Sequence, residues 1–382
     1  MIAPDPARLA GLLERLVAFD TQNPPGQEAA AAAVLVEQLR GFGMEAELRT
    51  IAPGRANAVG VLRNGAGPAV AFNSHIDTVP VGTGWSGDPL RLRAQDGRLY
   101  GRGACDAKGS IVAMAEACRL LAQSRDAWSG TLVATFVADE EVTATGSRTV
   151  AGEFPAFDAV IVGEPTDNEV LSAHRGCFRP LIRVHGTTAH SSRPDLGVNA
   201  INGAARLIGH IEAYDRDIGR RTHRLVGRAC VTTTQIAGGF ADNIVPDRCD
   251  LVLDRRLLPD EPPEMAMAEL QALLQRARDS DDVIADLVEV RMAAGGCETP
   301  STARVVRAAL AAATRQGRSP VAGGLTGGCD LVHFHALGSP GIILGPGSLN
   351  LAHKPDEYVP QAELAEASLI YRDIVLGMSA GA

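Results

Sequence analysis

Short apolar runs alternate with helical patterns along the chain, and four of the runs lead into acidic or imidazole side chains. The runs are Pro68–Phe72, Thr131–Ala138, Ala159–Val162 and Gly341–Leu344. Each is short and rich in β-forming residues, so each is predicted to be a buried strand. The side chains that follow the runs are His75 and Asp77, then Asp139, Glu140 and Glu141, then Glu164, and finally His353 beyond a glycine-rich turn.

Helical patterns and further strands fill the rest of the first half. Asp5-Pro6 provides an N-cap and a proline at the first helical position. Helices are also expected over 29–42, with Gly43 as the C-cap, and over 110–122. Strands are expected at 45–51, 57–62 and 68–73, with a tight turn at Asn64-Gly65. This alternation predicts an α/β domain with a mixed, largely parallel sheet and helices on both faces, whose ligand crevice lies at the carboxyl ends of the strands.

The pattern changes between Arg175 and about Met292. The expected elements there are a strand (178–185), a helix (199–213), two strands (228–236 and 248–256), a helix (262–278) and a strand (284–292). This β-α-β-β-α-β order is typical of a small ferredoxin-like α+β domain. The acidic and imidazole motifs resume only after it. Residues 175–292 are therefore predicted to be an insertion into a first domain made of 1–174 and 293–382.

Composition and charge narrow the class of protein. A chain of 382 residues exceeds the usual size of a single core, and 46% hydrophobic with 21% charged residues is typical of a soluble globular protein. A net charge of −9 without a basic cluster argues against nucleic acid and anionic membranes as partners. Neither a signal peptide nor a membrane span is expected. Seven scattered cysteines without a CxxC motif indicate reduced cytoplasmic thiols.

The polar side chains after the strands are candidate metal ligands. His75 and Asp77 point to the same side of an extended segment, so one ring nitrogen could bind a metal while the carboxylate holds the other. A satisfied polar pair at a strand end is the alternative. Residues 101–109 form a glycine-rich loop that adds Asp106. This loop lacks the spacing of a phosphate-binding loop and carries an aspartate where a phosphate would sit.

Two imidazoles and two carboxylates around a shared carboxylate suit two divalent ions. Zinc is the first choice, and ligands without cysteine also permit cobalt or manganese. Such ions share a bridging water and lower its pKa, and a carboxylate that is not a ligand can accept its proton. Glu140 and Glu141 are adjacent and would point differently. One can therefore be the base and the other a ligand, and the residues alone leave the assignment open.

Five motifs, in order, resemble the dinuclear-zinc amidohydrolase family that includes acetylornithine deacetylase, succinyl-diaminopimelate desuccinylase and glutamate carboxypeptidases. The motifs are His75-Ile76-Asp77, the loop 101–109 around Asp106, Asp139-Glu140-Glu141, Gly163-Glu164-Pro165-Thr166, and 345–353 ending in His353. The similarity covers the chain from near residue 10 to 375. Glu164 stands where aminopeptidase relatives carry aspartate, which favours the deacylase and carboxypeptidase side of the family.

The resemblance implies a role for each of these residues. Asp106 would bridge both metals. His75 and Glu164 would complete one metal site, and Glu141 and His353 the other. Glu140 would be the general base, and Asp77 would orient His75 without binding metal itself.

The resemblance extends to the inserted domain, which serves as a lid and dimerisation domain in the family. His190, in the segment 186–192, matches a histidine that reaches into the partner's active site in family dimers, where it would stabilise the tetrahedral oxyanion. Asn243 and Arg256 match positions that bind the substrate carboxylate, a task suited to an arginine fork. Strand alternation lets only one of Arg255 and Arg256 face the cleft, and the motif favours Arg256.

One position departs from the family pattern. Cys329, within Thr326–Asp330, stands where relatives carry a hydroxyl residue, which affects the expected shape of the substrate pocket. A nucleophilic Cys329 is the rival interpretation, but a thiol nucleophile needs a paired base, and the metal set is already complete without it.

The resemblance implies a cytoplasmic, homodimeric metallohydrolase that cleaves the amide bond of N-acyl-L-amino acids. N-acetylornithine is the first substrate to expect. Desuccinylation of succinyl-diaminopimelate, another N-acyl amino acid deacylation, and a dipeptidase or carboxypeptidase activity are alternatives. A non-catalytic binding protein on the same scaffold would have lost a ligand or the base, and none is lost here.

Overall fold

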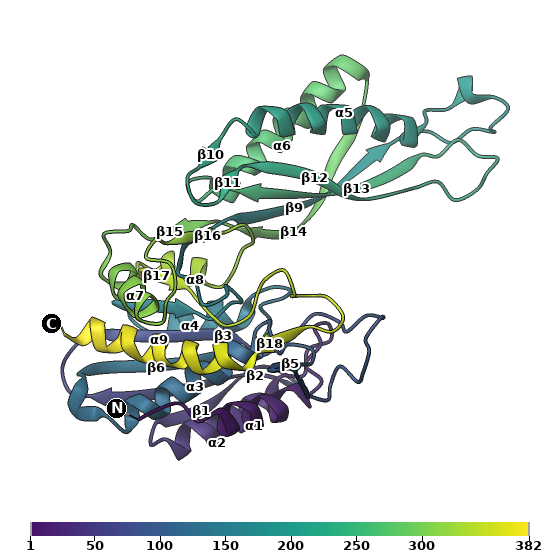
Figure 1. Cartoon of the computed structure of the whole chain (residues 1–382). Helices are drawn as coiled ribbons and strands as arrows, with labels where there is room; N and C mark the ends of the chain where they lie inside the picture. The colour runs from purple at the N-terminus through teal and green to yellow at the C-terminus, as the bar shows by residue number, and fades with distance from the viewer. Residues whose placement is uncertain (1, 381–382) are drawn as a thin grey trace. The chain divides into compact units, whose positions relative to one another are not determined.

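The computed structural model describes residues 2–380, which fall into two compact units (Figure 1). The first unit comprises Met1–Ser172, Thr299–Gly323 and Cys329–Ala382. The second comprises Ala173–Glu298 and Gly324–Gly328. No helix within residues 2–380 combines the length and apolarity needed to cross a membrane.

A nine-stranded mixed sheet is the centre of the first unit. In spatial order its main path is β1 (Glu45–Ala52), β2 (Arg55–Asn64), β6 (Gly130–Val137), β3 (Ala69–His75), β7 (Ala159–Val162), β17 (Gly341–Ile343), β8 (Leu171–His174) and β15 (Cys297–Glu298), with β16 (Gly323–Leu325) paired to β8. The neighbours β6, β3, β7 and β17 are parallel, whereas the strands outside them are antiparallel. The predicted largely parallel centre is therefore confirmed. These four parallel strands are the four apolar runs of the sequence.

Strand alternation gives the central sheet two buried faces. On β3, Val70 and Phe72 join the main core, whereas Ala71 between them is buried outside it. The main core is formed with α1 (Pro6–Val17), α2 (Ala29–Gly41), α3 (Lys108–Ala122), α7 (Arg304–Arg315) and α9 (Gln361–Ser379). The helices α4 (Thr145–Glu153) and α8 (Leu331–His335) pack on the sheet away from that cluster. Burial on both faces explains why these strands are continuous apolar runs.

Local signals set the helix ends. The Asp5 side chain accepts the backbone N–H of Ala7 at 3.0 Å, so the predicted N-cap is confirmed. Gly43 follows α2 with φ +80°, the left-handed conformation expected of a terminating glycine. Gly65 also has positive φ (+78°), but β2 and β3 do not pair as a hairpin, because β6 lies between them. The sequence signal for the turn is local. The order of the strands in the sheet depends instead on β6, which begins 65 positions after Gly65.

The second unit contains a four-stranded antiparallel sheet with the spatial order β12-β13-β9-β14. Its elements are β9 (Gly176–His185), α5 (Ala200–Ile218), β12 (Cys230–Gly238), β13 (Arg248–Leu257), α6 (Pro263–Asp281) and β14 (Ala285–Ala294). Their order is the predicted β-α-β-β-α-β. A short hairpin, β10 (Thr222–His223) with β11 (Gly227–Arg228), was not predicted. The helices α5 and α6 pack on the sheet and build a separate core.

Candidate metal centre

Four neighbouring strand ends bring the predicted ligands together in the first unit. His75 is the last residue of β3, Glu141 follows β6, Glu164 follows β7, and His353 lies beyond β17. Because these strands are parallel neighbours, their carboxyl ends share one edge of the sheet. Asp106 reaches the same place from the loop between β5 (Arg98–Tyr100) and α3.

Asp106 lies between the two histidines. Its Oδ1 is 3.1 Å from Nε2 of His75, and its Oδ2 is 3.4 Å from Nε2 of His353. Glu164 Oε1 lies 3.9 Å from the same His75 nitrogen, and Glu141 Oε1 lies 3.3 Å from the His353 nitrogen. Each Asp106 oxygen therefore faces one histidine, and each of these histidines has one glutamate nearby. This is the arrangement that a carboxylate shared by two ions requires.

The backbone of Asp77 fixes the orientation of His75. Nδ1 of His75 lies 2.9 Å from the Asp77 carbonyl oxygen, whereas the nearest Asp77 carboxylate oxygen is 3.7 Å away. Donation from Nδ1–H to the carbonyl leaves Nε2 free to face Asp106. The Asp77 carboxylate instead accepts the backbone N–H groups of Glu140 and Glu141, both at 3.1 Å. The side chain that was expected to orient the imidazole thus holds the turn that carries two predicted site residues.

The electrostatics of the cluster favour added positive charge. Burial raises the pKa values of Glu141 and Glu164. The neighbouring carboxylates of Asp106 and then Glu141 raise the pKa of His353 to about 10. Burial alone would lower the pKa of His75, but its hydrogen bond to Asp106 and the charge of Glu164 raise it well above the usual value. The carboxylates thus hold protons on the imidazoles, and divalent ions would displace those protons.

Unsatisfied oxygens show that the cluster fits metal ions. Glu141 Oε1 and Glu164 Oε1 are buried and accept no hydrogen bond, even though Glu141 Oε1 lies within ion-pair distance of His353. A buried carboxylate oxygen without a partner is costly unless a cation supplies one. The ligand atoms of His75, Asp106 and Glu141 lie within 4.8 Å of one another. Oxygen and imidazole ligands in this number suit zinc and similar divalent ions.

Glu140 differs from its neighbour Glu141. Within residues 2–380 its carboxylate forms no ion pair with either cluster histidine. Burial and the nearby charge of Glu164 raise its pKa well above the usual value, although the charge of His75 opposes the rise. The two adjacent glutamates therefore occupy different positions, one beside His353 and one apart from both histidines.

Several polar residues support this edge of the sheet through contacts that the sequence patterns do not predict. Asn23 donates to Asp77 at 2.9 Å and to Asp139 at 3.0 Å, and Arg55 pairs with Asp139 at 2.8 Å. Asp330 is buried with Asn73 and Ser147 as hydrogen-bond partners. Asn23 and Arg55 lie far along the chain from these partners and match no local motif. Cys329, next to Asp330, is buried.

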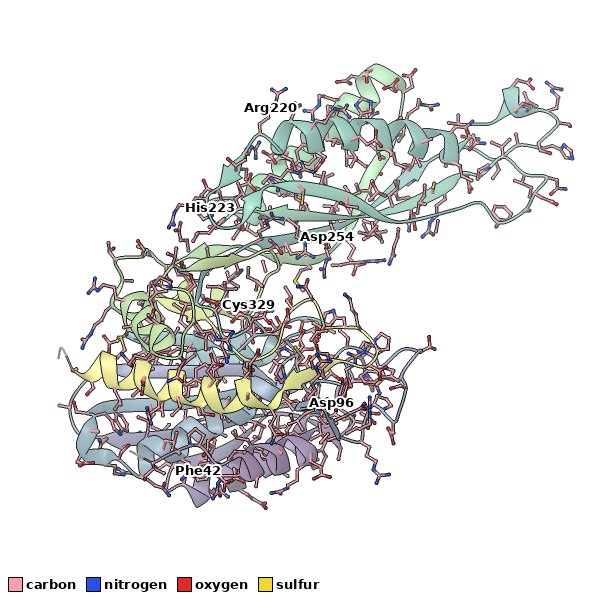
Figure 2. The ribbon with its side chains drawn as sticks, in the orientation of Figure 1. Phe42, Asp96, Arg220, His223, Asp254 and Cys329 are labelled. Carbon is pink, nitrogen blue, oxygen red and sulfur yellow. The ribbon has the colours of Figure 1, made fainter. Side chains whose placement is uncertain are left out.

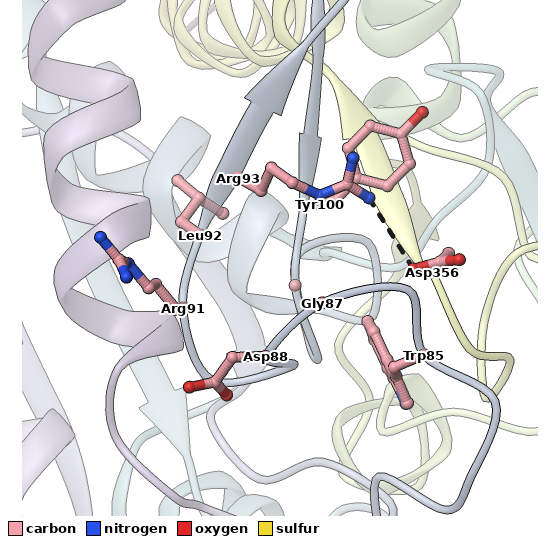
Figure 3. Close-up of a pocket in the computed structure, with 9 residues that line it drawn as sticks. Trp85, Gly87, Asp88, Arg91, Leu92, Arg93, Tyr100 and Asp356 are labelled. Carbon is pink, nitrogen blue, oxygen red and sulfur yellow. Dashed lines mark ion pairs between the residues drawn. The ribbon is translucent and has the colours of Figure 1, made fainter.

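A separate cavity of about 330 Å³ opens on the first unit (Figure 3). Trp85, Arg91 and Tyr100 are among its lining residues, and Arg93 and Asp356 lie across it at 3.8 Å. None of the predicted ligands lines it. The cavity is therefore distinct from the carboxylate cluster.

In the second unit, His190 and Asn243 lie together. The Ser191 N–H donates to the Asn243 carbonyl at 3.0 Å, and His190 pairs with Ile244 in an isolated bridge. His190 is exposed, and its Nδ1 accepts the Ser192 N–H at 3.1 Å. The proton of a neutral imidazole must then sit on Nε2, which leaves an outward hydrogen-bond donor.

Arg256 lies at the opposite end of the same sheet from Asn243. Asn243 precedes the first residue of β13, whereas Arg256 is its penultimate residue. The eight residue-to-residue steps of extended chain from Arg248 to Arg256 span roughly 26 Å. Arg256 pairs with Asp254 (Figure 2). Asp254 also accepts a hydrogen bond from Arg179 at 2.8 Å. The structure therefore does not bring the two predicted substrate contacts together within the second unit.

Strand alternation separates the adjacent arginines as predicted. Arg255 is buried with Glu261 at 2.9 Å, whereas Arg256 is partly exposed. The histidines outside the motifs have local partners: His174 is buried against the Arg175 carbonyl, and His185, His210 and His223 pair with nearby carboxylates. No disulfide occurs among the cysteines of the described chain.

Comparison with known proteins agrees with this geometry. Residues 71–377 match the peptidase family M20/M25/M40. An acetylornithine deacetylase from Myxococcus xanthus is 32% identical in an alignment 377 residues long that covers 95% of each chain. Aminopeptidase PepT from Bacillus cereus superposes with a TM-score of 0.81 at 23% identity, covering 98% of this chain and 99% of that one.

A further solved structure is similar in fold. The YXEP protein of Bacillus subtilis, described as a dinuclear metal binding peptidase from the M20 family, superposes with a TM-score of 0.75 at 17% identity over 99% of both chains. The resemblance inferred from the five motifs is confirmed, as is the predicted fold class. The chain belongs to the peptidase family M20/M25/M40 and is a metallohydrolase with a cluster of metal-ligating residues at the carboxyl edge of its central sheet.

Proposed function

We propose that this metallohydrolase cleaves the amide bond of N-acyl-L-amino acids, with N-acetylornithine as the preferred substrate. The observation that carries the chemistry is Asp106, whose two oxygens face different histidines at 3.1 and 3.4 Å. The substrate choice is supported by the deacetylase relative at 32% identity. Glu164, in place of an aspartate, also favours a deacylase over an aminopeptidase.

The proposed ligands are the five residues of the cluster. Asp106 would bridge two ions, His75 and Glu164 would complete one site, and Glu141 and His353 the other. Zinc is the proposed metal, with cobalt or manganese as alternatives. When bound, such ions lower the pKa of a shared water and polarise the substrate carbonyl.

Glu140 would act as the general base. A base must be a poor ligand, must sit beside the reacting water and must have a pKa near the working pH. Its carboxylate lies apart from both histidines, and burial raises its pKa well above that of a free glutamate. It would take the proton of the attacking water and return it to the departing amine, so that a carboxylic acid and a free α-amine are released. Asp77 would hold the Glu140 N–H during these transfers.

His190 would stabilise the oxyanion in the active site of a second subunit. Its free Nε2–H is the kind of donor that a developing oxyanion needs. A small amino acid cannot span roughly 26 Å along β13 to touch both Asn243 and Arg256 of one chain. The proposed homodimer resolves this, because one chain would supply Arg256 and the other Asn243 and His190 to the same substrate. The cytoplasm is the proposed location, where the cysteines would remain reduced.

A hydrolysis panel tests this function. Purified protein loaded with zinc or with cobalt is incubated with N-acetylornithine, other N-acetyl amino acids, N-succinyl-diaminopimelate and dipeptides, and the released amine is measured. The highest kcat/KM is expected with N-acetylornithine. A clear preference for the succinyl substrate or for dipeptides would replace the substrate assignment. No hydrolysis of any substrate by metal-loaded protein would favour a binding protein on the same scaffold.

A further inference from the structure

A buried ion pair lies beside the predicted metal centre without belonging to it. Arg102 and Glu357 are 2% and 1% exposed, and Nη1 of Arg102 is 2.5 Å from Oε2 of Glu357. The sequence motifs assign neither residue a role, although Arg102 lies within the glycine-rich loop and Glu357 follows His353 by four positions. A fully buried ion pair is weak grounds for stability, since desolvation offsets much of the attraction between its charges.

The second oxygen of Glu357 holds the backbone of the predicted bridging ligand. Oε1 accepts the N–H of Asp106 at 2.9 Å and the N–H of Cys105 at 2.9 Å. The Glu357 carbonyl also accepts the N–H of Gly101 at 3.0 Å. One side chain therefore fixes the main chain from which the Asp106 carboxylate projects.

Arg102 extends the same contacts to a third segment. Its Nη2 donates to the carbonyl oxygens of Pro80 and Val81, both at 3.3 Å, just beyond the His75–Asp77 motif. Its guanidinium also lies 5.1 Å from the centre of the Trp85 ring. The pair thus joins three segments that carry or adjoin predicted ligands: 75–81, 101–106 and 353–357.

We propose that Arg102 and Glu357 are positioning residues for the metal centre, which set the place of Asp106 and thereby the affinity for both ions. The proposal rests on the function proposed above, because it takes the Asp106 cluster as the metal site. Groups that orient metal ligands typically change metal affinity by about 10–100-fold when they are removed. Because Asp106 faces both histidines, its displacement would weaken both ions together.

The test measures metal binding directly, apart from catalysis. Glu357→Gln keeps the size of the side chain but removes its charge, and its amide cannot both accept the two N–H groups and pair with Arg102 as a carboxylate does. Zinc affinity is measured by competition with a chelating dye, and the cobalt-loaded protein is examined by visible absorption. We expect both zinc ions to bind about 10–100-fold more weakly. We also expect a changed cobalt spectrum.

A matched control separates positioning from simple stabilisation. Glu116 and Arg119 form another buried pair in the first unit, 2.6 Å apart on α3. Glu116→Gln removes the same charge and is expected to lower the melting temperature without changing zinc affinity or the cobalt spectrum. Equal effects of the two variants on metal binding would overturn the proposal.

Two further variants cover the remaining outcomes. Arg102→Lys keeps the charge but cannot form the fork that holds Glu357 and two carbonyls together, so it is expected to weaken zinc binding. This variant takes the place of Glu357→Gln in the test if Glu357→Gln does not fold. Arg102→Met combined with Glu357→Leu removes both charges, and weak metal binding is expected even if the protein is stable. If variants that fold bind zinc as tightly as the wild type, the positioning role is refuted and the proposed function is unaffected. If the wild type itself binds no metal, the proposed function is refuted.

Discussion

The two units present their predicted functional residues in opposite ways. In the first unit His75, Asp106 and Glu164 are almost fully buried, and they lie beside one another within one chain. In the second unit His190 is exposed, and Asn243 and Arg256 lie near opposite ends of β13, which spans roughly 26 Å from Arg248 to Arg256. The contrast indicates two kinds of site. One is assembled by folding alone, and the other, under the proposed function, draws on a second chain.

This difference also explains how each unit tolerates charge. The first unit concentrates carboxylates in its interior and satisfies them with imidazoles, backbone N–H groups and, as proposed, two metal ions. The second unit places its acids with arginines on a partly exposed sheet, as in Asp254 with Arg179 and Arg256. Buried charges without partners are costly, whereas exposed pairs contribute little either way.

The largest expected effect is the loss of the base in the first unit. Glu140→Gln should lower kcat by about three orders of magnitude, because general base catalysis typically contributes 10²–10⁴-fold. Steady-state hydrolysis of N-acetylornithine and zinc content are measured together. Zinc content should stay at the wild-type value. Full activity would remove Glu140 from the mechanism, and lost zinc would make it a ligand.

The next effect tests whether the second unit acts across subunits. His190→Ala should lower kcat by about 10²–10³-fold, as expected for the loss of one oxyanion donor. Mixed with Glu140→Gln subunits, it should recover about a quarter of wild-type activity, because random pairing gives half mixed dimers, each with one intact site. Absence of recovery in dimers shown to be mixed would place His190 in its own chain's site.

A smaller effect concerns the two ends of β13. Arg256→Ala should lower kcat/KM by about 10–100-fold through loss of a charge-assisted contact with the substrate carboxylate. Subunits carrying Arg256→Ala and Asn243→Ala should complement each other when mixed, because the proposed site draws on both chains. Arg291→Ala, which removes an exposed arginine of the same unit, serves as the control and should retain activity. Mixed dimers no more active than the parents would contradict the shared site.

The smallest expected effect concerns the stability that a partly exposed charged residue, Asp250, contributes to the second unit. Hydrogen bonds from Arg183 and Arg248 lower the pKa of Asp250 in the second unit. The unfolded state, with an aspartate pKa of about 3.9, therefore takes up a proton before the folded state does as the pH falls. Asp250→Asn should lower the free energy of unfolding by about 1 kcal/mol or less at pH 7.

The stability difference for Asp250→Asn should narrow as the pH falls below about 4. Denaturant unfolding of wild type and variant at several pH values measures it. Asp217→Asn, at an exposed pair 4.0 Å apart, should show no difference at any pH. A difference for Asp250→Asn that persists at low pH would mean that packing, not charge, is responsible.

Much of the fold could be predicted because its signals are local. The four parallel strands of the first unit are continuous apolar runs, since both faces of the sheet are covered. In the second unit, helix 263–281 and strand 248–257 lie within a few residues of the expected ranges. The turn signal at Asn64-Gly65 does not reveal which strands pair, because β6 enters between β2 and β3 from a distant part of the chain.

The residues of the candidate site also differ in whether a local sequence signal identifies them. His75, Asp106 and His353 are conspicuous because each belongs to a short motif at the end of a strand or in a glycine-rich loop. Asn23, Arg55 and Glu357 are not, since each contacts a partner at least 54 positions away along the chain. Strand alternation and periodicity carry no information about such pairs. They become visible only when the chain is folded.

His353 differs from the other predicted ligands in one respect that affects how the centre is filled. Its side chain is 53% exposed, whereas those of His75, Asp106, Glu141 and Glu164 are at most 9% exposed. Its backbone has φ +64°, which is uncommon outside glycine and is held by the surrounding loop. In the proposed two-metal centre, an ion beside His353 would therefore exchange with the buffer sooner than an ion beside His75. Protein moved from one metal solution to another is then expected to hold two different metals, because the outer ion is replaced first.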